Sequence, residues 1–269
     1  MYNSLFNKKL SNIEFKIKIS NEEWIKYGLV EKSKFFQWNI FDLYKANGYM
    51  TKIDNGKYTI NHTILKRIFS RGSFSLGGRF YGLVINNLSP KLRKSILING
   101  EPVAEPDFAC LHTTMAYHKS GLEPPENPYK IEKSETLDNQ EKALYRRAFK
   151  MALNILINAK TVGKAKAAFN NEKIKNEELR KIDTNTIFNE VMEYHKPIAH
   201  FFGSDFGIHA QLIDSQIMEN IMYKLLLKMN IPMFPIHDSV LCKKSDEQLV
   251  IDTMKSEYKA VMGYDIKVG

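Results

Sequence analysis

Strand-like runs that lead to an acidic residue recur in the hydrophobic pattern of this chain. The first two runs, 95–98 and 102–104, surround Asn99-Gly100, a dipeptide that tolerates the positive φ angles of a tight hairpin turn. This pattern predicts a β-hairpin whose second strand leads to Asp107. We therefore expect Asp107 to lie at the end of a rigid strand.

A second acidic residue, Asp238, interrupts another apolar run. The stretch 231–236 is followed by the polar triplet 237–239 and then by apolar residues at 240–242. A polar triplet inside such a run costs desolvation energy unless it serves a purpose. The pattern predicts a strand, a turn and a second strand, with Asp238 between the two strands.

Helical spacing of apolar residues predicts much of the remaining structure. Leu111, Met115 and 117–118 follow helical spacing until Ser120-Gly121 stops the pattern. Strands flanked by helices in this order predict an α+β fold with an antiparallel sheet. The other expected elements are a helix start at 20–24, strand-like alternation at 51–60, a loop at 124–128, a helix at 139–169, a polar loop or short helix at 170–185, a helix at 186–202 interrupted at Pro197, an amphipathic helix at 211–229 whose buried stripe includes Met229, a helix to Met262 that begins with a capping box at 245–248, and an edge strand at 266–268.

The charge pattern favours an anionic partner. The 269-residue chain has a formal net charge of +9 and 12% aromatic residues, on which bases can stack. Residues 142–181 contain eleven lysines or arginines against three glutamates, and this excess would attract an anion of many charges. Arg146 and Lys150 are four positions apart and share one helix face, which can hold a polyphosphate. Arg147 points elsewhere, toward a nucleic-acid backbone or a surface acid.

The cysteines, histidines and hydropathy argue against several other kinds of site and classes of protein. The seven histidines are scattered without an HExxH or Cys/His motif, so we expect no zinc site. Two cysteines, Cys110 and Cys242, make no disulfide framework and favour a reduced, cytoplasmic location. No run approaches about 18 apolar residues, so we expect no membrane segment. A dyad of His237 and Asp238 is disfavoured because adjacent residues on a strand point to opposite faces.

Asp107 and Asp238 are 131 residues apart in the chain, yet strands distant in sequence can be neighbours in one sheet. Chemistry on phosphates commonly uses carboxylates on rigid strands that share two Mg²⁺ ions about 3.5–4 Å apart. The two aspartates therefore predict a two-metal site for phosphoryl chemistry.

Four short motifs occur in a characteristic order. The run DFACLH at 107–112, followed by MAYH at 115–118, resembles motif A of the family A DNA polymerases and of their relatives, the single-subunit phage and mitochondrial RNA polymerases. The run IHDS at 236–239 resembles their motif C. Arg146 and Lys150 keep the RxxxK spacing of motif B, and SLGGRFY at 75–81 is similar to the T/DxxGR element that contacts template and primer backbone. The resemblance covers about residues 70–269.

This resemblance implies a right-hand polymerase fold. Its palm would be an antiparallel sheet with helices behind it, its helical fingers would be inserted into the palm, and no full thumb is evident. The implied organisation is a small N-terminal helix and hairpin module at 1–70, the first part of the palm at 71–124, the fingers at 125–202 and the second part of the palm at 203–269.

The resemblance also implies roles for individual residues. Asp107, Asp238 and the main-chain carbonyl of Phe108 would bind two Mg²⁺ ions, with Mn²⁺ as a substitute. Lys150 would neutralise the triphosphate and protonate the leaving group, and Arg146 would grip the terminal phosphates. The remaining residues with implied roles are His112, Asn154 and Asn158 at the nucleotide, and Arg79, Arg147, Gln211 and His237 at the nucleic acid.

Departures from the family pattern leave the sugar of the nucleotide open. His112 stands where the DNA enzymes carry glutamate, and Asn154 and Asn158 replace two aromatic residues of motif B. Ser239 matches the RNA enzymes. Because the spacing through motif A follows the DNA enzymes, deoxynucleotides are slightly favoured.

The function implied is that of a nucleic acid polymerase. Its partners would be a DNA or RNA primer-template, nucleoside triphosphates and a processivity or replication factor, without a membrane. Two alternatives stay open: an RNA polymerase, primase or template-independent transferase of the same fold, and a catalytically inactive polymerase-like module that binds nucleic acid.

Overall fold

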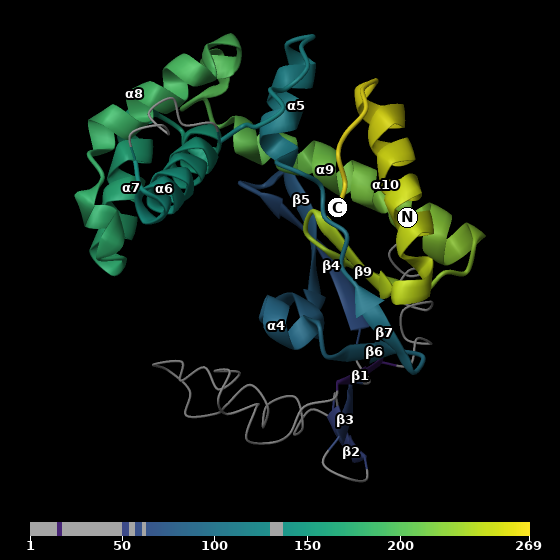
Figure 1. Cartoon of the computed structure of the whole chain (residues 1–269). Helices are drawn as coiled ribbons and strands as arrows, with labels where there is room; N and C mark the ends of the chain where they lie inside the picture. The colour runs from purple at the N-terminus through teal and green to yellow at the C-terminus, as the bar shows by residue number, and fades with distance from the viewer. Residues whose placement is uncertain (1–14, 18–49, 54–56, 61–62, 130–136) are drawn as a thin grey trace. The chain divides into compact units, whose positions relative to one another are not determined.

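The computed structural model describes residues 15–17, 50–53, 57–60, 63–129 and 137–269 (Figure 1). These residues form an α+β protein whose chain divides into two compact units. One unit, here called the sheet unit, combines Gly78–Phe108, Asp214–Gly269 and the described part of Met1–Phe69. The other, the helical unit, combines Ser70–Gly77 and Ala109–Ile213.

These divisions differ from the sequence-based boundaries at 124 and 202. The helix α5 (Leu111–Lys119) belongs to the helical unit because it packs on α6 (Asn139–Asn158) and on the 3₁₀ segment η5 (Lys196–Phe201). Asp107 and the helix that follows it in the chain therefore belong to different units.

Among the described residues, the sheet unit contains a seven-stranded antiparallel sheet with the strand order β2-β3-β1-β6-β7-β9-β8. This sheet confirms the expected α+β class. A separate two-stranded sheet pairs β4 with β5. The strands are β1 (Phe15–Ile17), β2 (Met50–Ile53), β3 (Lys57–Ile60), β4 (Thr63–Ser70), β5 (Ser73–Leu83), β6 (Ile96–Ile98), β7 (Glu101–Ala104), β8 (Met233–Ile236) and β9 (Ser239–Lys243).

The predicted hairpin before Asp107 is confirmed as β6 and β7, with Ile98 opposite Glu101. Asn99 and Gly100 form its two-residue turn with φ angles of 50° and 83°, as a type I′ turn requires. The side chain of Ile98 is fully buried, so this turn sets which face of β6 meets the core.

The predicted strand, turn and strand around Asp238 are also confirmed. Ile236 of β8 pairs with Ser239 of β9, which leaves His237 and Asp238 as the turn. His237 adopts a φ of 55°, a left-handed conformation that is uncommon for a residue with a side chain. β9 also pairs with β7 at Ala104, so the two hairpins are neighbours in one sheet.

Helices cover the core of the sheet unit (Figure 1). The helix α9 (Phe206–Met222) belongs to this unit from Asp214 onward and continues into a π-helical turn (Tyr223–Lys228), and α10 (Glu247–Met262) packs on β9 and on that turn. The helix expected at 211–229 therefore begins earlier than predicted, at Phe206, and becomes π-helical from Tyr223, and Met229 is exposed rather than buried. The other helical segments of this unit are η2 (Val84–Asn87), α4 (Pro90–Arg93) and η7 (Lys244–Asp246).

The capping box expected at 245–248 is wrong. The hydroxyl of Ser245 donates a hydrogen bond of 2.7 Å to Glu101 at the edge of β7 instead of capping α10. Serine hydroxyls can satisfy a tertiary acceptor as readily as a helix end, and a sequence pattern does not distinguish the two.

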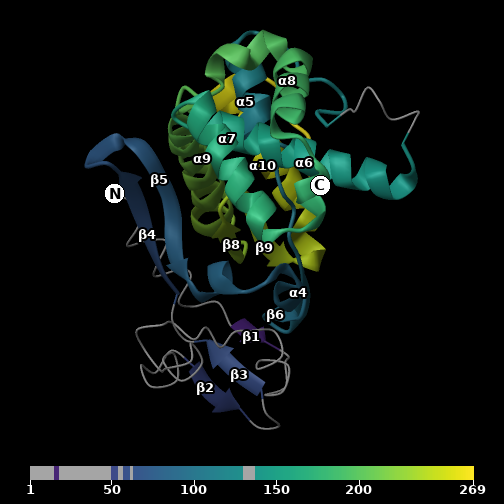
Figure 2. The ribbon, with the colours of Figure 1, turned by 90° about the vertical axis from the view of Figure 1, so that its left-hand side faces the viewer.

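Three helices pack together in the helical unit (Figure 2): α6, α7 (Val162–Lys175) and α8 (Thr184–Tyr194). Phe169 of α7 contacts Phe188 of α8 edge to face, with 5.6 Å between ring centroids. The single helix expected at 139–169 is in fact two, because Thr161 interrupts it and accepts a hydrogen bond from the Lys164 amide to begin α7. The segment η4 (Glu178–Lys181) and then α8 follow, and Pro197 lies in η5 after α8 has ended.

Other expectations have mixed outcomes. The strand-like alternation at 51–60 corresponds to β2 and β3, whereas the helix start at 20–24 lies outside the described residues. Of the edge strand expected at 266–268, Val268 forms a single bridge with Phe108. None of the helices among the described residues is long and apolar enough to cross a membrane.

Candidate functional site

Backbone pairing makes Asp107 and Asp238 neighbours in the sheet unit. Asp107 forms an antiparallel bridge with Ser239. The Phe108 amide donates to the carbonyl of Asp238 at 3.3 Å, and the Val240 amide donates to the carbonyl of Pro106 at 3.0 Å. The segment that follows β7 therefore runs along the hairpin that carries Asp238.

The other side of this segment is held by the last residues of the chain. The Asp107 amide donates to the carbonyl of Gly269 at 2.9 Å, and the Gly269 amide donates back to Asp107 at 3.1 Å. The Phe108 side chain is 3% exposed and packs against Tyr258 of α10, with ring centroids 5.9 Å apart. Main-chain bonds on both sides fix the backbone at Asp107.

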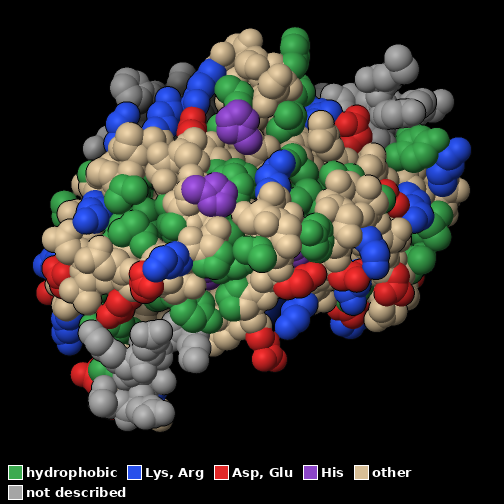
Figure 3. Space-filling model, turned by 90° about the horizontal axis from the view of Figure 1, so that it is seen from above, with side chains coloured by type: hydrophobic (Ala, Val, Ile, Leu, Met, Phe, Trp, Pro, Cys, Tyr) green, Lys and Arg blue, Asp and Glu red, His purple; other side chains and the backbone are tan. Residues whose placement is uncertain are grey.

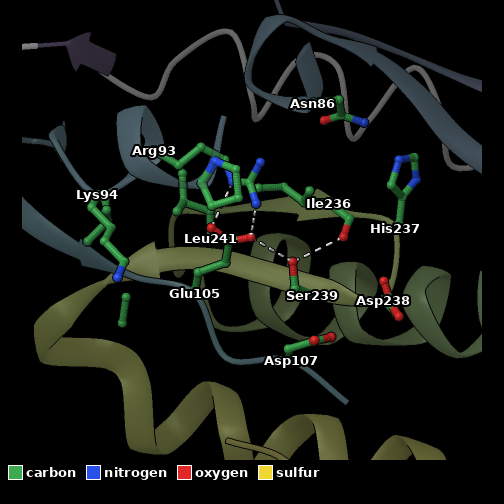
Figure 4. A pocket seen from close by; sticks show the side chains of 13 residues that line it. Asn86, Arg93, Lys94, Glu105, Asp107, Ile236, His237, Asp238, Ser239 and Leu241 are labelled. Carbon is green, nitrogen blue, oxygen red and sulfur yellow. Dashed lines mark hydrogen bonds and ion pairs between the residues drawn. The ribbon is translucent and has the colours of Figure 1, made fainter. Parts of the chain in front are cut away.

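Both aspartates line one pocket of about 710 Å³ within the sheet unit. Asp107 is exposed and Asp238 is half-buried, so both carboxylates can meet a ligand. Figure 4 shows the two carboxylates at the same end of the pocket. The pocket is lined by Asn86, Pro90, Arg93, Lys94, Val103, Ala104, Glu105, Asp107, Ile236, His237, Asp238, Ser239 and Leu241.

An ion pair next to this pocket supports the turn that carries Asp238. Arg93 of α4 donates two hydrogen bonds to Glu105, at 2.8 and 2.6 Å, and a third to the carbonyl of Leu88. Glu105 in turn accepts a hydrogen bond of 3.1 Å from the hydroxyl of Ser239, which also donates to the carbonyl of Ile236 (Figure 4). Glu105 therefore connects the strand leading to Asp107 with the turn at Asp238.

Arg79 and His237 have partners within the protein. Arg79 donates hydrogen bonds of 2.9 and 2.5 Å to the buried Asp214. Burial opposes the charge of Arg79, but Asp214 and Asp238 together outweigh burial and raise the pKa of Arg79. The imidazole of His237 packs edge to face on Tyr81 at 5.3 Å. Burial and then the charge of Arg79 lower the pKa of His237, so its ring is neutral at pH 7. Its Nδ1 is buried and has no hydrogen-bond partner among the described residues.

Asp107 and Asp238 are the two residues of this pocket that the sequence predicted as metal ligands. The described residues contain no cluster of three or more histidine, cysteine, aspartate or glutamate side chains that could hold a metal. Mg²⁺ is commonly held by one or two carboxylates together with substrate phosphates and water. Asp107 and Asp238, two carboxylates on one pocket, satisfy that requirement.

The basic residues predicted on one helix face lie together on α6 of the helical unit. The guanidinium carbon of Arg146 is 5.2 Å, and the ammonium nitrogen of Lys150 5.5 Å, from the centroid of the Tyr129 ring. Arg147 is directed elsewhere and forms an exposed ion pair with Glu178 at 3.4 Å. The prediction that Arg147 lies off this face is confirmed.

At least one face of the molecule carries no concentrated basic patch. On the face drawn in Figure 3, lysines and arginines are interspersed with acidic and hydrophobic side chains. The pairing of Arg146 with Lys150 is therefore a more informative feature than the net charge.

The remaining predicted site residues belong to the helical unit. His112 is half-buried in the first turn of α5, Gln211 is half-buried on α9, and Asn154 and Asn158 are exposed on α6. Asn158 donates a side-chain hydrogen bond of 2.7 Å to the carbonyl of Asn154. Its roles in the structure are thus to bond its own helix and to pack on Gly207, whose absent Cβ would lie 2.0 Å from the Asn158 amide oxygen.

Sequence reasoning missed Glu105, Arg93 and Tyr129. Glu105 and Arg93 are twelve residues apart, and their pairing depends on how α4 meets the sheet. Tyr129 follows the proline-rich loop at 124–128, which carried no signal beyond the loop itself.

No protein-family model matches this chain, and no curated protein matches it significantly.

Proposed function

We propose that this protein is a nucleotidyltransferase that adds nucleotides to a nucleic-acid 3′-hydroxyl, and by a small margin we favour template-directed DNA synthesis. The observation that carries the proposal is the bridge between Asp107 and Ser239, which brings two carboxylates from distant parts of the chain to one pocket. Two neighbouring carboxylates repel phosphate in the absence of a cation. A divalent ion that binds both carboxylates and an anionic substrate would therefore explain why they lie together.

Asp107 and Asp238 would hold the Mg²⁺ or Mn²⁺ ions. When bound, such ions lower the pKa of an attacking hydroxyl and neutralise charge on a departing pyrophosphate. The contribution of the chain is to hold the carboxylates in place before substrate arrives. Main-chain bonds on both sides of Asp107 and the tight turn at Asp238 do so, and preorganised charges need little rearrangement during reaction.

The polyphosphate of the incoming nucleotide would bind to Arg146 and Lys150. A planar guanidinium binds phosphate oxygens with two parallel hydrogen bonds, while an ammonium acts as a compact point charge and can donate a proton to a leaving group. Arg79, with its charge maintained by Asp214, would contact the nucleic-acid backbone together with His237.

The hydrogen bonds of Ser239 explain why a serine occupies this position, whichever sugar the nucleotide carries. Its side chain is 6% exposed and its hydroxyl donates to Glu105 and to the carbonyl of Ile236. A glutamate at this position would meet Glu105 as a like charge. The serine shared with the RNA enzymes therefore does not by itself favour ribonucleotides.

Primer extension tests the proposal. A labelled primer on a DNA template would be incubated with Mg²⁺ and either deoxynucleotides or ribonucleotides, beside a lane without primer. We expect extension that is lost in Asp238→Asn and retained in Asp252→Asn, a matched change of an exposed aspartate on α10. Equal extension by wild type and Asp238→Asn would contradict the two-metal assignment, and the nucleotide consumed identifies the sugar class.

A second candidate is a nucleic-acid-binding module of the same fold without synthesis. The observation in its favour is that Asn158, in place of an aromatic residue, is bonded to its own helix. Binding of the labelled DNA without extension in any lane would favour this candidate.

A further inference from the structure

Both basic residues of the α6 face contact one buried aromatic ring. Tyr129 is 7% exposed, and its ring lies within 5.5 Å of both the Arg146 guanidinium carbon and the Lys150 ammonium nitrogen. Cations at this distance are attracted to the negative face of an aromatic ring. The ring therefore stabilises two charges that would repel each other at positions i and i+4 of a helix.

Neither cation is neutralised by an acidic side chain of the residues that the structure describes. Among the described residues Arg146 and Lys150 have no carboxylate partner, whereas the adjacent Arg147 pairs with Glu178 at 3.4 Å. Both residues are exposed, and their charged groups lie over the same ring. Two adjacent cations that lack an acidic partner in the described part of the chain favour a ligand with several adjacent negative charges.

The ring itself is anchored at both ends of the residue. The Tyr129 hydroxyl lies 2.9 Å from the Cys110 sulfur, which precedes the first residue of α5. The Tyr129 amide donates to the side chain of Asn127 at 3.1 Å, and the carbonyl of Asn127 accepts from the Tyr194 hydroxyl at 2.8 Å. The loop from Asn127 to Tyr129 is thus bonded to α8. Its position is held by contacts other than those with the basic side chains.

A buried histidine completes this anchoring. His195 is fully buried, and one ring nitrogen donates to the carbonyl of Pro128 at 2.9 Å, so its other nitrogen accepts from the Tyr117 hydroxyl at 2.9 Å. Burial lowers the pKa of His195 and raises the pKa of Tyr117 to about 12. At neutral pH the histidine is therefore uncharged and the tyrosine protonated, which is what these two hydrogen bonds require.

We propose that Tyr129 is a positioning residue that holds Arg146 and Lys150 together as a receptor for the polyphosphate of a nucleoside triphosphate. The choice of nucleotide rests on the proposed function, while the receptor for adjacent negative charges rests on the contacts of Tyr129 alone. Tyr129 acts through the two basic side chains and does not itself touch the ligand.

The test varies the negative charge on the ring face across a series of phenylalanine rings that all lack the hydroxyl. Phenylalanine and its successively fluorinated analogues at position 129 would be compared for binding of inorganic tripolyphosphate and of deoxyadenosine triphosphate by calorimetry. Fluorine withdraws charge from the ring face, so we expect affinity for both ligands to fall stepwise, to a total of about fivefold. Tyr129→Leu should weaken binding by a similar factor, raise the KM for nucleotide and leave the KM for primer-template unchanged.

Two controls identify the route of the effect. Arg147→Gln removes a neighbouring charge that is off the ring, and we expect it to change tripolyphosphate affinity by less than about twofold. In a chain that already carries Arg146→Gln and Lys150→Gln, fluorination at position 129 should have no further effect, because the ring acts through those residues.

The outcomes separate this proposal from the proposed function. Affinity that is independent of fluorination, or that still depends on it after both cations are removed, overturns the role of Tyr129 even if primer extension succeeds. Binding of tripolyphosphate that depends on the ring, without primer extension, upholds the receptor and overturns the polymerase.

Discussion

The carboxylates of the sheet unit and the cations of the helical unit are organised in opposite ways. Asp107 and Asp238 are 131 residues apart and are joined by main-chain bonds of a sheet. Arg146 and Lys150 are one helical turn apart and are joined by contacts of their side chains with Tyr129. The first arrangement needs the whole sheet to form, whereas the second needs a single helix and one ring.

This difference predicts different responses to mutation. Because the backbone holds the aspartates, their side chains can be changed without loosening the sheet. Because side chains hold the cations, changes at the ring or at either cation alter the receptor directly. In the sheet unit, changes at the aspartates should therefore alter activity and leave stability intact. In the helical unit, the effects of mutation on activity and on stability should be less clearly separated.

The largest effect should come from Asp107→Asn. On the proposed function, loss of this carboxylate charge would remove several kcal/mol of transition-state stabilisation, so we expect nucleotide incorporation to fall by about 10³-fold or more. The free energy of unfolding should be unchanged or slightly higher, since one of two neighbouring like charges is removed. Incorporation and urea unfolding measured on the same preparation check both halves, and a large loss of stability would contradict the backbone account.

Glu105→Ala tests whether the ion pair supports the turn at Asp238. It leaves Arg93, whose side chain is 12% exposed, without its carboxylate, and we expect a loss of about 2 kcal/mol in unfolding free energy. Glu105→Gln keeps the shape and an acceptor for Ser239 and should cost about half as much. Urea denaturation measures both, and equal losses would mean that the charge on Glu105 is not what matters.

Neutralising the α6 face should have an intermediate effect. We expect Arg146→Gln together with Lys150→Gln to raise the KM for nucleoside triphosphate about tenfold or more, since each charge-assisted contact with phosphate is among the stronger hydrogen bonds. The dependence of KM on salt should also weaken. Arg147→Gln, one position away and paired with Glu178, is the matched control, and an effect as large as that of the double change would refute the distinction between the faces.

The smallest effect should appear in the pH dependence of stability. Burial lowers the pKa of His195 below its ordinary value of 6.5, so the unfolded chain takes up this proton at a higher pH than the folded one. Stability from this group is fully present above about pH 6.5 and is lost as the pH falls toward the lower folded pKa. Urea unfolding at several pH values should show a shallower acid slope for His195→Gln than for wild type, and identical slopes would show that His195 does not contribute.

Local features of this protein were predictable because they depend on neighbouring residues. The hairpin turn at Asn99-Gly100 follows from the positive φ angles that this dipeptide accepts, and the shared face of Arg146 and Lys150 follows from helical periodicity. The same reasoning failed at Thr161, whose side chain caps the start of a second helix where apolar spacing predicted one continuous helix, and at Ser245, whose hydroxyl donates to a tertiary acceptor.

The chain alone therefore determined the turns, most helices and the two aspartates as candidates, through short-range periodicity and turn chemistry. Only the tertiary structure decided that Asp107 pairs beside Asp238, that Glu105 and Arg93 support their turn, and that Tyr129 lies under both cations. The physical reason is that strand register and the contacts of a loop residue are set by which distant surfaces meet, and a sequence pattern carries that information only weakly.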